Sequence, residues 1–338
     1  MKVKVLWFSL MFILIMSLLG VNFVTQAQNM STAAKKSLAR SVAVTFDDLP
    51  ITQDGGLTDL AELKVITEKL LSSLKTHKVP VIGFVNESKL QKNNEVEQRT
   101  AILRLWLDAG FELGNHTFSH KSLFTTPLKQ FQEDLLQGEK ITRVLMQERG
   151  KKLRYFRHPF LNTGPDLKTK TEFEKFLTQY GYKVAPVTID NHEWIFARAY
   201  SEAKHRGDNA SAQRIADLYV PYLEETFEFY EKYSVTLFGR EIPQILLLHA
   251  NQLNADRFDE LAQMLKRRGY SFINIDQALA DSAYAHQDTY TGPVGISWLQ
   301  RWAITKGEQF KKEPYLPEYM RQFDNTSASG SNYKNGKH

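Results

Sequence analysis

Side chains suited to acid–base and metal chemistry gather at a few points of this chain. Asp47 and Asp48 are adjacent, and His116 and His120 are four residues apart. Two histidines at that spacing, together with a carboxylate, are the ligands of an open-sided Zn²⁺ site of three protein ligands. Taken singly, the aspartates could cap a helix and the histidines could be solvated, so the prediction rests on their being brought together.

Three further polar clusters could complete such a site, and they are Arg157–Phe160, Asp190–Trp194 and His249–Asn251. Each of the five clusters lies at the C-terminal end of a segment that is predicted to be a strand. In parallel α/β folds the carboxyl ends of the strands share one face, where active sites are built. We therefore expect all five clusters to converge there.

The strands and helices that must position these clusters alternate along the chain. Short apolar segments rich in β-branched residues predict seven strands, at Ser41–Phe46, Val79–Val85, Phe111–Leu113, Leu153–Arg157, Tyr182–Ile189, Gln244–Ala250 and Ser271–Ile275. Apolar residues at helical spacing predict helices between them, at Thr58–Thr76, Glu95–Ala109, Thr126–Gly150, Glu172–Tyr180 and Asp256–Arg268. The alternation predicts an α/β fold with parallel strands.

One stretch departs from this alternation of strands and helices. Residues 194–234 lie between the fifth and sixth predicted strands and have helical character, but they are too many for an ordinary crossover. We expect an inserted helical hairpin, which either shapes the substrate cleft or packs away from it.

The composition narrows the class of protein. The chain has 338 residues, 42% hydrophobic and 24% charged, and no Cys. These values are typical of a globular protein, and the missing Cys excludes disulfides and thiolate metal ligands. The net charge of +5 falls to +3 without Lys2 and Lys4, which gives no reason to expect nucleic-acid binding.

The two ends of the chain are distinct from its centre. A basic start, an apolar run and small residues at Thr25–Ala27 predict a signal peptide over residues 1–27. An uncleaved membrane anchor is the alternative, and it would be the protein's one link to a membrane. In either case we expect export, to a periplasm or to the medium. Residues 286–321 form a C-terminal extension, and the polar residues 322–338 predict a disordered tail.

The five clusters, in their order, resemble the motifs of the polysaccharide deacetylases of the NodB-homology type (carbohydrate esterase family 4). The matching segments are Thr45–Asp48, His116–His120, Arg157–Phe160, Asp190–Trp194 and Leu247–His249. Glu193 stands where the family usually has Asp, and His158 is an unusual residue within its motif. The resemblance covers a domain at 40–285.

This resemblance implies a distorted (β/α)₇ barrel, here with the helical insertion 194–234. It also implies a divalent metal, most simply Zn²⁺ with Co²⁺ as the alternative, held by Asp48, His116 and His120. Asp47 would be the catalytic base. Because adjacent residues at a strand end point different ways, we expect one aspartate to bind the metal while the other faces the water.

The remaining motif residues receive roles in the same hypothesis. Arg157 would fix Asp47, and the backbone N–H of Phe160 would stabilise an oxyanion. His249 would protonate the leaving amine and would be oriented by a carboxylate, either Glu193 or Asp190. Trp194 would wall the pocket or simply pack.

The expected reaction is hydrolysis of N-acetyl groups on a polysaccharide of N-acetylglucosamine type, with release of acetate. Peptidoglycan, a chitin-like polymer and an exopolysaccharide are all compatible with an exported enzyme. One alternative keeps the metal site but acts on a non-sugar amide or an O-acetyl ester. An alternative of another class is a glycan-binding protein without catalysis.

Overall fold

The computed structural model describes residues 40–52 and 59–324. The predicted signal at 1–27 lies outside the described residues, as does residue 325 and beyond in the predicted tail. Seven strands form one sheet, and they are β1 (Arg40–Leu49), β2 (Val81–Val85), β3 (Glu112–Asn115), β4 (Tyr155–Phe156), β5 (Lys183–Val184), β6 (Gln244–His249) and β7 (Tyr270–Phe272).

The sheet curls into a distorted barrel. Its strands run in the order β5-β4-β3-β2-β1-β6, all paired in parallel, and β7 pairs with β1. Beyond β5 the chain crosses to β6, where Ile189 forms a parallel bridge with Leu246. The segment after β5 thereby reaches the edge strand β6. The expected α/β barrel with seven strands is confirmed, although β4 and β5 have only two residues each.

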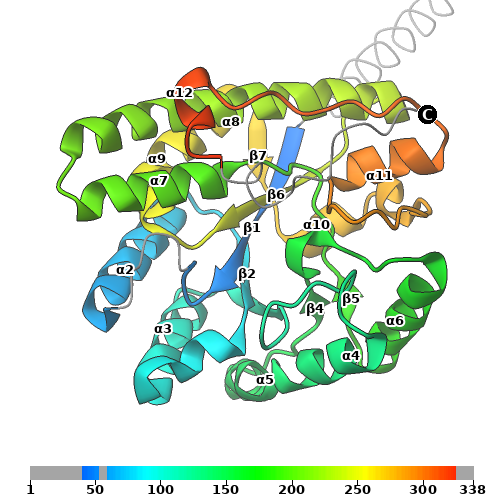
Figure 1. The fold of residues 1–338 in the computed structure, drawn as a ribbon, viewed down its shortest axis with the longest axis horizontal. Helices are drawn as coiled ribbons and strands as arrows, with labels where there is room; N and C mark the ends of the chain where they lie inside the picture. The colour runs from blue at the N-terminus through cyan, green and yellow to red at the C-terminus, as the bar shows by residue number, and fades with distance from the viewer. Residues whose placement is uncertain (1–39, 53–58, 325–338) are drawn as a thin grey trace, which may run out of the picture. The chain divides into compact units, whose positions relative to one another are not determined.

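Helices surround this sheet (Figure 1). They are α2 (Leu60–Thr76), α3 (Val96–Asp108), α4 (Leu128–Gln137), α5 (Lys140–Glu148), α6 (Leu167–Gln179), α7 (Glu193–His205), α8 (Asn209–Phe238), α9 (Gln252–Arg267), α10 (Ile275–Leu279), α11 (Trp298–Thr305) and α12 (Glu318–Arg321), with shorter 3₁₀ turns at Glu87–Asn94, Pro159–Leu161 and Ser282–Ala285. Among the described residues, none of these helices combines the length and the apolar character that a membrane span requires.

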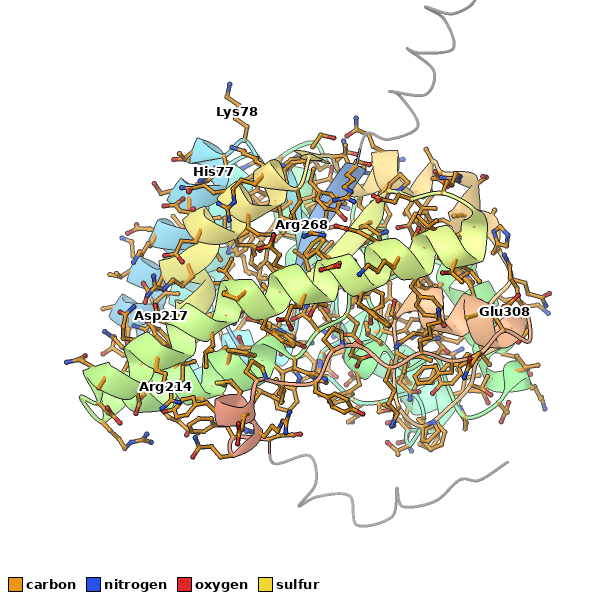
Figure 2. The ribbon with its side chains drawn as sticks, turned by 90° about the horizontal axis from the view of Figure 1, so that it is seen from above. His77, Lys78, Arg214, Asp217, Arg268 and Glu308 are labelled. Carbon is orange, nitrogen blue, oxygen red and sulfur yellow. The ribbon has the colours of Figure 1, made fainter. Side chains whose placement is uncertain are left out.

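The expected helical insertion is present as the antiparallel pair α7 and α8. It begins one residue earlier and ends four residues later than predicted, since α8 continues to Phe238 and stops at Gly239 in the left-handed conformation (φ 70°). Figure 2 shows α8 crossing above α9, whose C-terminal Arg268 donates to Glu231 of α8 at 2.6 Å. The insertion is therefore attached to the barrel's outer helices.

The single helix predicted over 126–150 is wrong, because the chain forms α4 and α5 with a break at Gly138. At that point the backbone passes against the loop that carries the two predicted metal histidines. A Cβ atom on Gly138 would lie 2.3 Å from both the backbone nitrogen of Phe118 and the carbonyl carbon of Thr117. The apolar periodicity of the segment continues across this break, which is why sequence reasoning missed it.

We predict that Gly138→Ala destabilises the protein by about 1–3 kcal/mol, because the methyl group meets backbone that cannot move aside as a side chain could. Chemical denaturation measures the change in the free energy of unfolding. The neighbouring exposed Gln137→Ala is the matched control, with a change within about 0.5 kcal/mol. Equal stability of the two variants would contradict the contact.

Candidate active site

Strand β1 carries both aspartates, and an irregularity in the strand turns them to the same side. The register of β1 against β2 shifts between Phe46 and Leu49, and Asp48 has a positive φ of 70°. As a result the carboxylate oxygens of Asp47 and Asp48 both lie 3.8 Å from Nε2 of His116. The expectation that the two side chains point different ways is wrong, because the bulge removes the alternation of a regular strand.

Asp48, His116 and His120 form a cluster that could hold a metal ion. One ligand atom from each lies within 4.8 Å of the others. Oδ1 of Asp48 is 3.5 Å from Nε2 of His120 and 3.8 Å from Nε2 of His116. Ligand atoms around a tetrahedral Zn²⁺ are about 3.4 Å apart, since the bonds are about 2.0–2.2 Å long. The buried Asp48 Oδ1 accepts no hydrogen bond from the described residues, so this donor set fits a divalent cation.

The surroundings of His116 and His120 favour the neutral imidazoles that a metal ion binds. Nδ1 of His116 donates to the carbonyl oxygen of Arg157 at 2.8 Å, which leaves the lone pair of Nε2 facing Asp48. Burial lowers the pKa of His116 well below its ordinary value and also lowers that of His120. A neutral imidazole can bind a cation without first losing a proton.

The loop between these histidines is held by a residue that sequence reasoning missed. Asp134 of α4 accepts from the hydroxyl of Ser119 at 2.6 Å and from its backbone N–H at 3.1 Å. Thr117 and His120 both have positive φ, at 67° and 56°. Such conformations cost about 1–3 kcal/mol each and persist only where surrounding contacts fix them. The sequence feature that could have identified Asp134 is an acidic residue on the buried face of an amphipathic helix.

Lys89 is a second residue that the sequence gave no reason to select. It lies in the 3₁₀ turn after β2, and its ammonium is 3.3 Å from Oδ1 of Asp48 and 3.1 Å from the Asp48 carbonyl oxygen. Burial alone would raise the pKa of Asp48, but Lys89, His120 and His116 outweigh it, and the pKa falls well below its ordinary value. Asp48 is therefore ionised, and Lys89 balances its charge.

Arg157 is fully buried and spans the gap from β4 to β1. Its guanidinium lies 3.4 Å from Oδ2 of Asp47, donates to Oγ1 of Thr45 at 2.9 Å, and stacks over the ring of Phe84 at 4.7 Å. Burial raises the pKa of Asp47 to about 6, while Arg157 and His249 oppose that rise. The other carboxylate oxygen of Asp47 is buried and accepts no hydrogen bond within the described residues.

His249 ends β6 and is paired with a carboxylate. Its Nδ1 donates to Oε2 of Glu193 at 2.8 Å. Of the two carboxylates expected to orient His249, Glu193 makes the contact, so the longer side chain still reaches. Burial alone would lower the pKa of His249, but the hydrogen bond and charge of Glu193 dominate and raise it to about 9.

Two amides that sequence reasoning did not select fix Glu193 in turn. Asn251 and Asn254 both donate to its Oε1, the latter at 2.7 Å. Tyr219 of the insertion donates to Asn254 at 2.6 Å. Because Glu193 is the first residue of α7, the insertion supports His249 from behind. Asn251 was visible in the sequence as the end of its strand cluster, whereas Asn254 carried no signal.

The other predicted residues lie at different distances from this centre. Asp190 is within electrostatic range of Arg157 and His249, and burial together with Glu313 raises its pKa to about 7. The ring of Phe160 is 60% exposed and packs edge-on against His120, with centroids 4.4 Å apart. Trp194 packs against the core, and the guanidinium of Arg198 lies 5.5 Å from the centre of its ring. His158 is buried against Phe173.

Comparison with known proteins shows what part of this site resembles. Residues 34–185 match a family model described as polysaccharide deacetylase. Over these residues the chain is similar to the polysaccharide deacetylase family. The resemblance seen in the motifs is thereby confirmed. The match contains the segments of Asp47, His116 and Arg157, whereas Glu193 and His249 lie beyond it, and His249 reaches the electrostatic range of Asp47 through the fold.

A peptidoglycan-N-acetylglucosamine deacetylase of Bacillus cereus is 26% identical over 153 residues, which are 45% of this chain and 46% of that protein. The chain thus aligns with less than half the length of this relative. A solved peptidoglycan deacetylase from Bacillus subtilis shares 21% identity with a TM-score of 0.44, over 72% of this chain and 92% of that one. A pseudoenzyme of family CE4 from Bacillus anthracis shares 17% identity with a TM-score of 0.45, over 71% and 65%.

We predict that Lys89→Met raises the affinity of this protein for Zn²⁺ by about tenfold or more, because the ammonium competes with a metal cation for Asp48. Isothermal titration calorimetry on the chelated protein measures the affinity. Lys92→Met, in the same turn, is the matched control and leaves the affinity unchanged. A Lys89→Met variant that binds Zn²⁺ equally or more weakly would show that the lysine assists the site instead.

We predict that Glu193→Gln lowers the pKa of His249 from about 9 to about 6.5 or below, because the imidazolium loses its anionic partner while its burial remains. An NMR titration of the His249 ring in metal-free protein measures it. Glu202→Gln, on the same helix, is the control. A pKa of His249 that stays near its original value in Glu193→Gln would refute the pairing.

Proposed function

We propose that this protein is a metal-dependent deacetylase that hydrolyses N-acetyl groups on a cell-envelope or extracellular polysaccharide of N-acetylglucosamine type and releases acetate. One observation carries the proposal. Asp47 presents an ionisable oxygen without a hydrogen bond beside a cluster of three metal-ligand side chains, and a protonated His249 lies within electrostatic range of both. A base, a cation site and an acid are the groups that amide hydrolysis needs.

Asp48, His116 and His120 would hold the metal, with Zn²⁺ as the best fit and Co²⁺ as the alternative. When bound, such an ion polarises an acyl oxygen and lowers the pKa of water. The family of the matched domain supports this proposal, and the neutral state of the two imidazoles agrees with it.

Asp47 would accept the proton of the attacking water. Its pKa of about 6 leaves it ionised at neutral pH, yet close enough to neutrality for efficient general-base catalysis. Arg157 would hold Oδ2 of Asp47, so that Oδ1 stays directed at the water. In this proposal Asp47 accepts the proton and Arg157 holds Asp47 in position.

His249 would protonate the leaving nitrogen. An amine leaves poorly until it is protonated, and a pKa of about 9 keeps His249 charged at neutral pH. Glu193 stabilises that charge and fixes the ring. The backbone N–H of Phe160 would stabilise the oxyanion, because the strained backbone at Phe160 and Leu161, with φ of 56° and 52°, is where a functional constraint is expected.

Export to a periplasm or to the medium remains part of this proposal, and it rests on the predicted signal at 1–27. Peptidoglycan has the support of the Bacillus cereus relative, described as a peptidoglycan-N-acetylglucosamine deacetylase. Chitin-like polymers and exopolysaccharides offer the same N-acetylated sugar.

We predict that the purified protein releases acetate from at least one N-acetylated glycan only when Zn²⁺ or Co²⁺ is restored after chelation. Asp47→Asn lowers turnover by about 10²–10⁴-fold while metal stays bound, and His120→Ala loses the metal. Acetate is assayed enzymatically on peptidoglycan, on N-acetylglucosamine oligomers and on an O-acetylated glycan, and metal by mass spectrometry.

Several outcomes would contradict the proposal. Release of acetate from the O-acetylated glycan alone would favour an esterase. An Asp47→Asn variant as active as the unchanged protein would exclude Asp47 as the base. Full metal binding without turnover on any acetylated substrate would favour a glycan-binding protein.

A further inference from the structure

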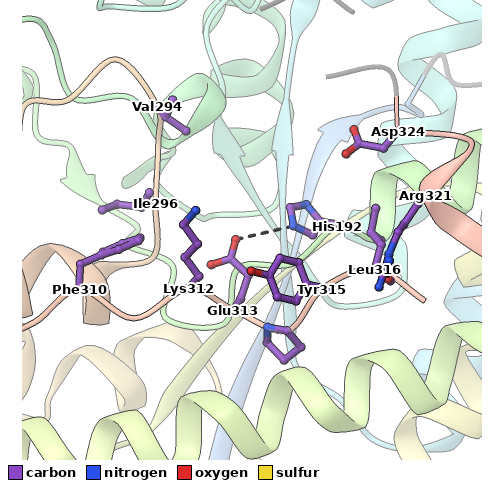
Figure 3. A pocket seen from close by; sticks show the side chains of 11 residues that line it. His192, Val294, Ile296, Phe310, Lys312, Glu313, Tyr315, Leu316, Arg321 and Asp324 are labelled. Atoms are coloured by element: carbon purple, nitrogen blue, oxygen red, sulfur yellow. Dashed lines mark hydrogen bonds and ion pairs between the residues drawn. The ribbon is translucent and has the colours of Figure 1, made fainter. Parts of the chain in front are cut away.

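A pocket of about 530 Å³ lies beside the active site, on the C-terminal extension (Figure 3). Residues of the extension between Val294 and Asp324 form all of its lining except His192. His192 lies in the short segment between Asp190 and Glu193, and its Nε2 is 3.7 Å from Oε1 of Glu313. His192 therefore connects the pocket to the segment of Asp190 and Glu193, and Glu313 of the pocket lies within electrostatic range of Asp190.

The extension is fixed to the active site by a buried arginine. Arg301 of α11 is fully buried, donates to Oγ1 of Thr163 at 3.0 Å and to the carbonyl oxygen of Leu161, and pairs with Asp288 at 3.1 Å. A buried charge with this many partners holds its neighbours firmly. Arg301 therefore connects the loop that carries Phe160 to the C-terminal extension.

Exposed apolar side chains lead from the metal cluster to this pocket. Phe160, which is 60% exposed, packs on His120. The backbone of Gly295 lies so close to the carbonyl oxygen of Phe160 that a Cβ atom would be 1.8 Å from it. Next to Gly295 is Val294, 51% exposed, which lines the pocket. Phe160 and Val294 are thus exposed apolar side chains between the metal cluster and the pocket.

The pocket itself combines aromatic faces with polar groups. Tyr315 is 79% exposed and Phe310 is 40% exposed. Glu313 is held by Gln300, whose Nε2 donates to it at 2.8 Å, so that its carboxylate has a fixed position. The lining carries cations at Lys312 and Arg321 and anions at Glu313 and Asp324. This balance suits an uncharged ligand, and sugar rings offer apolar C–H faces to aromatic rings and hydroxyls to fixed carboxylates.

We propose that this pocket is a subsite for an uncharged pyranose ring of the same polymer, next to the sugar that is deacetylated. The inference rests on the proposed function and deepens it, because it makes the preferred substrate an oligomer that spans both places. The exposed ring of Tyr315 is the stacking platform, and Glu313 accepts from sugar hydroxyls.

The test compares Tyr315→Ala with the unchanged protein on N-acetylglucosamine oligomers of one to six units. In the unchanged protein kcat/KM rises with chain length, and in Tyr315→Ala that rise is lost, with about a tenfold deficit on the hexamer. Tyr180→Ala, an exposed aromatic residue on α6, is the control and keeps the rise. An equal loss on all lengths, or no loss, overturns the subsite while the deacetylase function stands.

A binding measurement separates the two proposals. The hexamer is titrated by NMR against the zinc-loaded protein carrying Asp47→Asn, with and without Tyr315→Ala. Weaker binding in the double variant supports the subsite even if the unchanged protein releases no acetate, in which case only the proposed function fails. Equal binding by both, or none by either, overturns the subsite whatever the turnover.

Discussion

Two adjacent carboxylates facing the same histidine are the constraint from which the rest of this site follows. A regular strand would send Asp47 and Asp48 to opposite faces. The bulge in β1 and the positive φ of Asp48 bring both to 3.8 Å from Nε2 of His116. Like charges so close and so buried are unfavourable unless cations or hydrogen bonds compensate for them.

The surrounding elements supply that compensation and divide the two carboxylates by role. Lys89 lies against Asp48 and keeps it ionised, whereas Arg157 holds one oxygen of Asp47. The pKa of Asp48 falls while that of Asp47 rises to about 6. Carboxylates whose pKa values are driven apart in this way are suited to different tasks. In the proposed function, Asp48 is the metal ligand and Asp47 is the base.

The positive charge of His249 is also compensated. His249 is held protonated by Glu193, and Glu193 is held by two asparagine amides from the start of α9. The inserted helices reach this network through Tyr219. Substrate contacts on the C-terminal extension, by contrast, would be set by Arg301, which fixes the extension to the Phe160 loop. Distant parts of the chain thus supply separate walls of one site.

The sequence predicted the parallel strands and the residues at their ends because strand periodicity and residue type are local properties, and the resemblance of the motifs implied the barrel. It did not predict the direction of Asp48, which depends on the pairing of β1 with β2. The ammonium of Lys89 and the amide of Asn254 reach the site only through packing between distant elements. The helix break at Gly138 was hidden for the same reason, since the backbone at Thr117 causes it.

The most direct test of this account is the anomalous diffraction of zinc in crystals of the protein. We expect one zinc peak within bonding distance of Asp48 Oδ1, His116 Nε2 and His120 Nε2, with Asp47 outside the ligand set and Lys89 moved away from Asp48. A peak bound by Asp47, or no peak at this cluster in zinc-saturated crystals, would contradict the division of roles between the two aspartates.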